Sequence, residues 1–266
     1  MSLLEWINLI TCGIATYNYR NHVASDIAIG DSDLPAENIQ SQNYLNTIQT
    51  WTEDNKMRLN AEKSNLMIFN FTHNYQFSTR LYLQDTLLNI VSETKLLGTW
   101  ISSDLTWWKN TNYITKKAYQ KLEIVRKLYN FNVSLTDLVL IYTLYVRSTL
   151  EFNCCVWTFN ITEEESDDIE RVQKVACRVI LKENYISYNN ALTVLNLQVL
   201  AERRKMLCER FATNCMKYPK SKDMFPLNPS SDLYLRQTEK YKVDFARKGR
   251  LLNSAIPQMQ RLLNKK

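Results

Sequence analysis

Basic side chains are the chemistry that the spacing of this sequence most clearly places together. Four of them recur at i, i+3, i+7 and i+11, which is one stripe of a helix: Arg171, Lys174, Arg178 and Lys182. A second basic set occupies an earlier helical segment: Lys116 and Lys127 on one face, flanked by Lys117 and Arg126. Such stripes can track the phosphates of a nucleic acid and give affinity without sequence readout. The alternative is the solvated face of an amphipathic helix.

Groups that would bind a metal ion are not predicted. Templated nucleotide addition uses two metal ions held by carboxylates, but the only two adjacent aspartates, Asp167-Asp168, lie in an acidic stretch that suits a helix N-terminus. The six cysteines include no C-x-x-C pair, and the chain has only two histidines. A zinc site is therefore not expected, nor is any other cofactor. We expect the thiols to be small buried side chains, as in a protein from a reducing compartment.

Charge is unevenly distributed along the 266 residues. The net charge is −5 over residues 1–107, +4 over 108–218 and +7 over 219–266. Positive charge concentrated late in the chain favours a polyanionic partner, although a solvated surface with a basic tail has the same composition. Residues 3–15 are apolar but too short to span a bilayer. We therefore expect an intracellular protein, cytoplasmic or nuclear, without a membrane partner.

Hydrophobic periodicity predicts an α+β fold in three parts. In the first part, helices are expected over 3–17 and from Pro35 to about Lys56. Short extended runs follow at 66–71, 80–83, 88–91 and 95–102, and they predict a small antiparallel sheet. Residues 80–83 and 88–91 are expected to pair as a hairpin.

From Ile114 the apolar period becomes helical, which predicts a bundle over 108–218. Ser134 with Asp137, and Thr162 with Glu165, have the spacing of helix-capping boxes. Arg147 and Glu151 are one turn apart in an apolar helix and are expected to form a structural ion pair. Later helices are expected near 190–195 and over 197–217. Residues 219–266 read as a basic, partly ordered tail with a terminal helix near 257–263.

Several segments, taken in order, carry a family resemblance. They are LNAEK (59–63) with NLMIF (65–69), LLGTWI (96–101), ITKKAYQKL (114–122), IYTLYVRSTLE (141–151) and IERVQKVACRVI (169–180). Together they resemble the end of the palm and the thumb of a non-LTR (LINE-like) retrotransposon reverse transcriptase. The resemblance covers about 2–217 and rests on the order and spacing of the segments. It implies a truncated palm over 1–107 and a thumb-like domain over 108–218.

The resemblance also implies roles for particular residues. Lys63 would lie near an incoming triphosphate, where an ammonium can neutralise pyrophosphate; its spacing alone indicates a surface lysine. Leu97 and Gly98 would belong to a hairpin that grips the primer, with Gly98 letting a phosphate approach the strand, whereas a bulge in an edge strand is the structural alternative. The two basic stripes would contact an RNA–DNA duplex. Trp107 and Trp108 could stack on a base, although packing at the junction of sheet and helices is the simpler interpretation.

Because this family's catalytic aspartates are not found in the sequence, the resemblance implies a fragment of an RNA-directed DNA polymerase. We expect it to bind RNA–DNA hybrid or single strands and not to polymerise alone; Mg²⁺ is expected only for the parent enzyme. One rival interpretation is a segment of a complete polymerase, cut by a gene-model error or by decay of the element. The other is a helical module that binds protein. The oligomeric state is not predicted.

Overall fold

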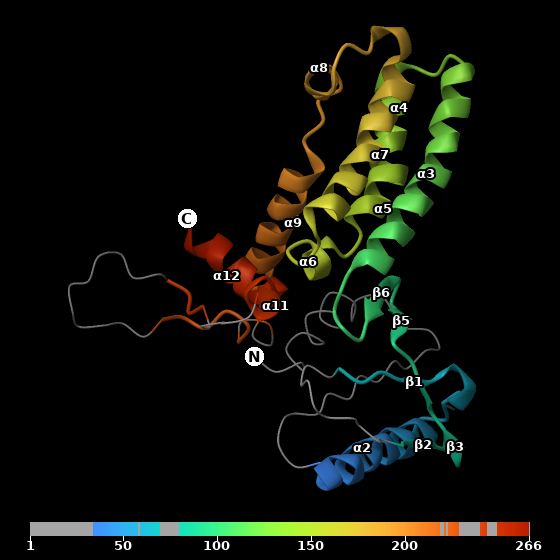
Figure 1. The fold of residues 1–266 in the computed structure, drawn as a ribbon, viewed down its shortest axis with the longest axis vertical. Helices are drawn as coiled ribbons and strands as arrows, with labels where there is room; N and C mark the ends of the chain where they lie inside the picture. The colour runs from blue at the N-terminus through green and yellow to red at the C-terminus, as the bar shows by residue number, and fades with distance from the viewer. Residues whose placement is uncertain are drawn as a thin grey trace, which may run out of the picture. The chain divides into compact units, whose positions relative to one another are not determined.

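The chain divides between Thr106 and Trp107 into two units, and the fold is α+β. The computed structural model describes residues 34–57, 59–69, 80–218, 221, 223–228, 240–243 and 249–265 (Figure 1). The helix expected over 3–17 lies outside these residues. Among the described helices, none is both long enough and apolar enough to cross a membrane.

The first unit combines one long helix with short strands. Helix α2 (Leu34–Asp54) confirms the helix predicted to begin at Pro35, and it is followed by the 3₁₀ turn η1 (Ala61–Lys63). The strands are β1 (Asn65–Leu66), β2 (Tyr82–Leu83), β3 (Thr86–Leu87), β4 (Asn89–Ile90), β5 (Glu93–Leu96) and β6 (Thr99–Ser102).

Helix α2 packs its apolar side on the β2–β3 hairpin. Leu45 of the helix shares a small core with Leu81, Leu83 and Leu88. Beside this core the Gln42 side chain pairs with the backbone of Tyr82 in both directions, accepting from the N–H at 2.9 Å and donating to the carbonyl at 2.8 Å. The amide thus satisfies the edge of β2 as a neighbouring strand would.

The prediction of one antiparallel sheet is wrong. The described strands form three separate two-stranded sheets: β2 with β3 and β5 with β6 are antiparallel, whereas β1 and β4 are parallel. The hairpin expected between 80–83 and 88–91 closes earlier, because Leu83 pairs with Thr86. Residues 89–90 then leave the hairpin and pair with β1.

Two-residue turns explain why the hairpin closes earlier than expected. Gln84 and Asp85 have φ of 50° and 64°, and Leu97 and Gly98 have φ of 47° and 93°. Positive φ at both central residues is what a tight type I′ hairpin requires. The extended run expected over 95–102 is therefore a hairpin, with Gly98 in the turn between β5 and β6 and not in a bulge of an edge strand. The role of Gly98 there is to adopt a backbone angle that side chains disfavour.

The second unit is built from helices of alternating direction (Figure 1). The longer ones are α3 (Trp108–Asn130), α4 (Leu135–Ile141), α7 (Glu163–Leu181), α8 (Tyr188–Val194), α9 (Leu200–Cys215) and α12 (Ala255–Asn264). The short ones are the π-helix η2 (Tyr142–Arg147), α5 (Ser148–Glu151), α6 (Cys154–Trp157), the 3₁₀ turn η3 (Lys182–Asn184) and α11 (Gly249–Leu252).

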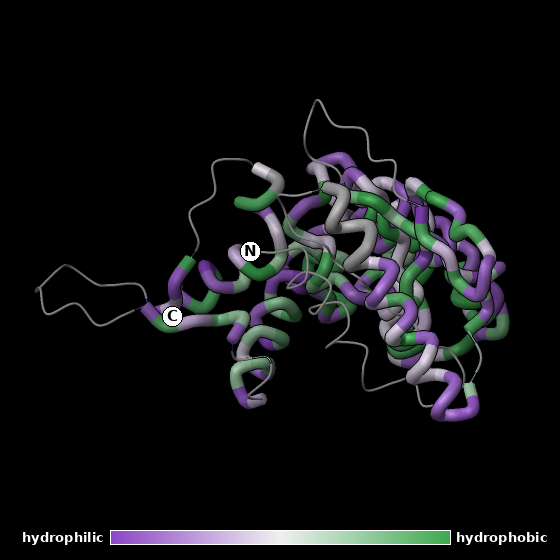
Figure 2. The backbone as a smooth tube through the Cα atoms, turned by 90° about the horizontal axis from the view of Figure 1, so that it is seen from below, coloured by the Kyte–Doolittle hydropathy of each residue, from purple (hydrophilic) through white to green (hydrophobic). Residues whose placement is uncertain are grey.

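The core of this unit lies where α3 packs along α7. Side chains with no exposed surface come from α3 and α7 at helical spacing: Ala118, Leu122, Ile169, Val172 and Ala176. Hydrophobic and hydrophilic residues alternate along the helices of Figure 2, as amphipathic packing requires. Helix α12 packs on α9 and α6, with Met259 fully buried.

One predicted helix contains an irregularity that periodicity did not indicate. The segment beginning after Ser134 runs through α4, then a π-helical stretch, η2, and ends in α5. Lys121 of α3 supports this stretch, because its Nζ donates to the Tyr145 carbonyl at 3.0 Å and to Thr149 Oγ1 at 2.8 Å. Partial burial lowers the pKa of Lys121.

Candidate nucleic-acid interface

Helix α7 carries the main basic stripe, and its start is fixed by a capping box. The Thr162 hydroxyl accepts from the Glu165 N–H at 3.1 Å, and the Glu165 carboxylate accepts from the Thr162 N–H at 2.7 Å. Both predicted partners are therefore confirmed. At Ser134 only half of the arrangement forms: its hydroxyl accepts from the Asp137 N–H at 3.2 Å, but the Asp137 carboxylate binds that same hydroxyl.

The stripe lies on the side of α7 opposite its buried residues. Arg171, Arg178 and Lys182 are exposed, and Lys174 is half-buried. Arg171 pairs with Asp168 at 2.5 Å, so one member of the acidic pair Asp167-Asp168 has an ordinary surface role. The other three cations form no ion pair with a carboxylate of the described residues.

Those three cations each lie near a tyrosine ring. Lys174 Nζ is 5.5 Å from the centre of the Tyr188 ring, and the Arg178 guanidinium is 5.4 Å from that of Tyr185. Lys182 Nζ is 5.0 Å from the Tyr129 ring. A ring face attracts a cation without neutralising it. The arrangement therefore orients three positive charges and leaves them available to an anion.

The end of α7 brings these rings together. Lys182 leaves the helix with a positive φ of 49°, and η3 then turns the chain toward α8. Tyr185 follows that turn, while Tyr129 comes from the last turn of α3. A shallow, open hollow results, lined by Tyr129, Arg178, Lys182 and Glu183.

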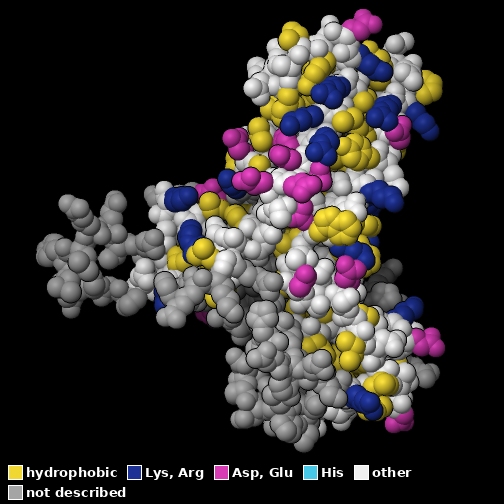
Figure 3. All heavy atoms as spheres, viewed as in Figure 1, with side chains coloured by type: hydrophobic (Ala, Val, Ile, Leu, Met, Phe, Trp, Pro, Cys, Tyr) yellow, Lys and Arg dark blue, Asp and Glu magenta, His cyan; other side chains and the backbone are white. Residues whose placement is uncertain are grey.

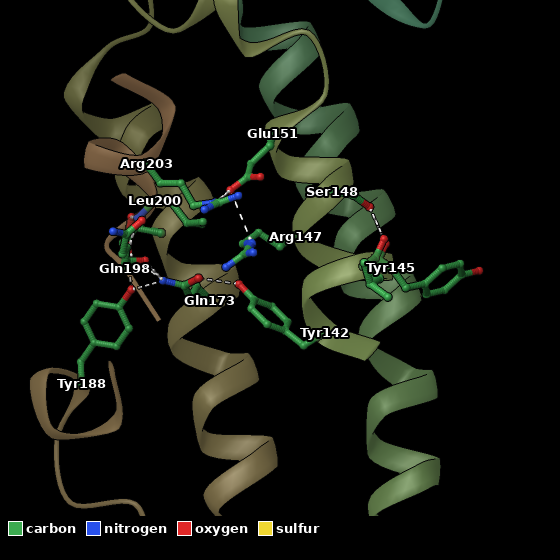
Figure 4. A network of polar contacts seen from close by, with 12 residues as sticks. Tyr142, Tyr145, Arg147, Ser148, Glu151, Gln173, Tyr188, Gln198, Leu200 and Arg203 are labelled. Atoms are coloured by element: carbon green, nitrogen blue, oxygen red, sulfur yellow. Dashed lines mark hydrogen bonds and ion pairs between the residues drawn. The ribbon is translucent and has the colours of Figure 1, made fainter. Parts of the chain in front are cut away.

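A buried polar network holds Tyr188 in place (Figure 4). The Tyr142 hydroxyl donates to Gln173 Oε1 at 2.7 Å, and Gln173 Nε2 donates to the Tyr188 hydroxyl at 2.8 Å. That hydroxyl donates to the Glu170 carboxylate, which also accepts the Leu200 N–H at 3.0 Å. The network thus joins η2, α7, α8 and the start of α9. Burial raises the pKa of Tyr142, and burial together with the hydrogen bond to Glu170 raises the pKa of Tyr188.

The predicted Arg147–Glu151 ion pair is confirmed, at 3.6 Å. Glu151 has a second and closer partner, because Arg203 of α9 binds the same carboxylate oxygen. In Figure 4 both guanidinium groups lie toward Glu151. The pair is therefore part of a three-residue cluster that ties α5 to α9, and burial lowers the pKa of Arg147.

The basic set on α3 is exposed as well. Lys116, Lys117, Arg126 and Lys127 all lie outside the buried face. Arg126 is paired with Glu123, and Lys117 lies 5.7 Å from the ring of Tyr113 on its own helix. Figure 3 shows Lys and Arg side chains gathered among hydrophobic ones over the part of the molecule where Figure 1 places α3, α4 and α7.

The other predicted site residues belong to the first unit or to the junction. Lys63 is exposed and ends η1, two residues before β1. Leu97 and Gly98 form the β5–β6 turn described above. Trp107 is buried to 1% exposure before α3, so packing explains it, whereas Trp108 is 63% exposed.

Within the described part of the chain, one group of three or more metal-ligand side chains comes together: Cys154, Cys155 and Cys208. It contains no carboxylate. Four cysteines are buried as expected, and Cys155 is half-buried; Cys12 lies outside the described residues.

Sequence reasoning missed the three tyrosines that accompany the stripe. The sequence gives little indication of these contacts. Tyr129, for example, is far from α7 in sequence, and only the fold places its ring beside Lys182. Comparison with known proteins adds no relative: no family model, curated protein or solved structure matches the chain.

Proposed function

We propose that the helical unit binds the sugar–phosphate backbone of an RNA–DNA hybrid or a single strand, as the thumb of a non-LTR reverse transcriptase does. On this proposal residues 1–107 correspond to the end of a palm. The observation that supports it most is the α7 stripe, where Lys174, Arg178 and Lys182 are oriented by tyrosines and lack carboxylate partners among the described residues.

Counterion release explains why such a stripe would bind. Each phosphate that a Lys or Arg neutralises frees condensed counterions, so affinity is high at low salt and falls as salt increases. A carboxylate paired with each cation would already neutralise it and would remove this contribution of counterion release to the affinity. Contacts to phosphate carry no sequence information, so binding through the stripe would be independent of sequence.

Nucleotide transfer is a separate matter, because it requires Mg²⁺ held by carboxylates. No three carboxylates come together among the described residues. The described residues therefore do not fit a two-metal centre, and we derive no polymerisation step from them. Synthesis by a complete parent enzyme is a proposal that follows from the resemblance alone.

The test is a titration of the full chain against a fluorescently labelled RNA–DNA hybrid at low salt, followed by anisotropy. The test variant combines Lys174→Glu, Arg178→Glu and Lys182→Glu. The control combines Lys205→Glu, Arg210→Glu and Lys217→Glu, which change three exposed cations of α9 and its end. We expect the α7 variant to bind at least about tenfold more weakly than the control, because only it removes phosphate contacts. Equal loss in both variants would reject the stripe as the interface.

A protein partner is the second candidate function, and one observation favours it. Leu140 and Leu144 lie one turn apart on α4 and η2 and are 52% and 67% exposed. Exposed leucines at helical spacing suit an apolar partner surface. Changing both to Lys would abolish a salt-resistant protein association and leave hybrid binding unchanged. If it weakened hybrid binding instead, these leucines would belong to the nucleic-acid surface.

A further inference from the structure

Three cysteines from two helices meet in the interior of the helical unit. Helix α6 packs against α9, and this contact brings the Sγ atoms of Cys154, Cys155 and Cys208 within 4.8 Å of one another. Cys154 is 3% exposed and Cys208 is fully buried, whereas Cys155 is half-buried. The cluster therefore has two interior thiols and one that reaches toward the surface.

A buried cation lies near this cluster. Arg204 is 2% exposed and precedes Cys208 by one turn of α9. Its guanidinium donates to two neutral hydroxyls, Thr158 Oγ1 at 3.1 Å and Ser166 Oγ at 2.8 Å, and its Nη1 has no hydrogen-bond partner. No carboxylate of the described residues accepts a hydrogen bond from it. Burying a cation is costly, so Arg204 favours the anionic form of any acidic group beside it.

Cys154 can supply such an anion. The thiols of Cys155 and Cys208, whose sulfurs lie within 4.8 Å of its own, lower the pKa of the Cys154 thiol, and the nearby Arg204 charge acts in the same direction. The proximity of Cys154 raises the pKa of the other two thiols. Glu170 is the carboxylate whose charge acts most strongly on Arg204, and the Cys154 sulfur comes next.

We propose that Cys154 and Cys208 are an oxidation-sensitive thiol pair, which a small hydroperoxide converts into a disulfide joining α6 to α9. Geometry selects this pair over Cys154 with Cys155. Neighbouring Cα atoms are about 3.8 Å apart across a trans peptide, which is shorter than the usual span of about 4.4–6.8 Å across a disulfide. Cys208 is therefore the partner that α9 provides.

The reaction has two steps. The Cys154 thiolate attacks one peroxide oxygen, the O–O bond breaks, and the product is a sulfenic acid plus hydroxide, which takes up a proton to become water. The Cys208 sulfur then attacks the Cys154 sulfur, the S–O bond breaks, and its hydroxyl leaves with the Cys208 proton as a second water. Two thiols lose two electrons and the peroxide gains them. Hydrogen peroxide is close to water in size, and on this proposal it reaches Cys154 from the side of the half-buried Cys155.

The experiment treats the folded full chain with hydrogen peroxide, blocks the remaining thiols, and maps disulfides by mass spectrometry. We expect a Cys154–Cys208 link with loss of two hydrogens, formed at least about tenfold faster than oxidation of the buried Cys177, because burial raises the pKa of Cys177 and a thiolate attacks peroxide much faster than a thiol does. In Cys208→Ala, we expect Cys154 to stop at sulfenic acid, which a 1,3-dione reagent traps. In Cys155→Ala the link still forms.

Three results would overturn the proposal. One is the absence of the link in the folded wild-type chain, whatever the variants do. Another is a link through Cys155 that disappears in Cys155→Ala. The third is a stoichiometric thiophilic metal in the purified chain that protects all three thiols. Cys177→Ala is the matched control, since it removes a buried cysteine of α7 outside the cluster and leaves the link intact.

Discussion

Glu170 shows how a single side chain positions the proposed interface. This carboxylate is 7% exposed on α7, accepts the N–H of Leu200 at the start of α9, and accepts the hydroxyl of Tyr188. The N-terminal end of a helix favours a negative charge, so α9 offsets the cost of burying it. Tyr188 in turn lies beside Lys174. One buried acid therefore links the core to the stripe.

Replacing Glu170 should destabilise the folded protein. Glu170→Gln keeps the shape of the side chain but removes the negative charge to which Tyr188, Leu200 and Gln173 donate hydrogen bonds. We therefore expect a loss of about 2–3 kcal/mol in the free energy of unfolding. Urea denaturation measures it. Glu183→Gln, at an exposed position beside the hollow, should cost almost nothing. Similar costs for both would show that the network contributes little.

Cys177 makes stability depend on alkaline pH. Burial raises its pKa from 9.0 to about 12, so the unfolded chain releases this proton first. Its contribution is complete below pH 9 and is lost as pH rises toward about 12, at up to roughly 1.4 kcal/mol per pH unit. We expect Cys177→Ala to lose less stability than the wild-type chain between pH 8 and pH 10.5. Parallel curves would mean that the thiol ionises normally. Cys177 also raises the pKa values of Tyr142 and Tyr188, so its removal weakens their loss of stability at alkaline pH in the same direction.

At the scale of elements, the capping box determines how α7 begins. Thr162→Ala removes the acceptor for the Glu165 N–H, and we expect a loss of about 1 kcal/mol. Thr136→Ala, at an exposed position in the first turn of α4, is the matched control and should be neutral. Thermal unfolding compares the two. An unchanged midpoint for Thr162→Ala would show that packing alone sets the start of α7.

The β5–β6 turn gives a second element-scale expectation. Gly98 has a φ of 93°, so Gly98→Ala should strain the turn and cost about 1 kcal/mol or more. The loss of stability in the hairpin is measured as faster hydrogen exchange of the Thr99–Ser102 amides. Gly249→Ala is the control, since an added Cβ there meets no atom within 4 Å. Unaltered exchange in Gly98→Ala would mean that the turn tolerates a side chain.

Local signals predicted most helices and few of the strand pairings. Periodicity located α3, α7 and α9, because each buries an apolar stripe that the sequence displays. Helix α2 was located with the help of Pro35, and its predicted stripe is only partly buried, because Trp51 is 52% exposed. The strands are only two to four residues long, too short to establish a period, and their pairing depends on turns with positive φ at Gln84 and Leu97. The stripe on α7 was predictable, since it is contiguous. Its tyrosines and the thiol cluster were not, because they depend on contacts between distant helices.

At the scale of the whole chain, charge is segregated between the two units. Residues 1–106 carry six Lys and Arg against 11 Asp and Glu, whereas residues 107–266 carry 27 against 16. A polyanion is therefore attracted by the second unit and repelled by the first. This segregation makes the salt dependence of binding a property of the molecule and not only of the stripe.

That dependence gives the last expectation. For the full chain on an RNA–DNA hybrid, the logarithm of the binding constant should fall linearly with the logarithm of the KCl concentration. If Lys174, Arg178 and Lys182 each neutralise one phosphate, reversing all three should reduce the magnitude of that slope by about 2–3, given about 0.7–0.9 per phosphate contact. The α9 control triple changes net charge by the same amount and should reduce the slope by less than about 1, since it removes no direct contact. Equal slopes in the two triples would mean that net charge alone drives association, and the α7 stripe would lose its status as an interface.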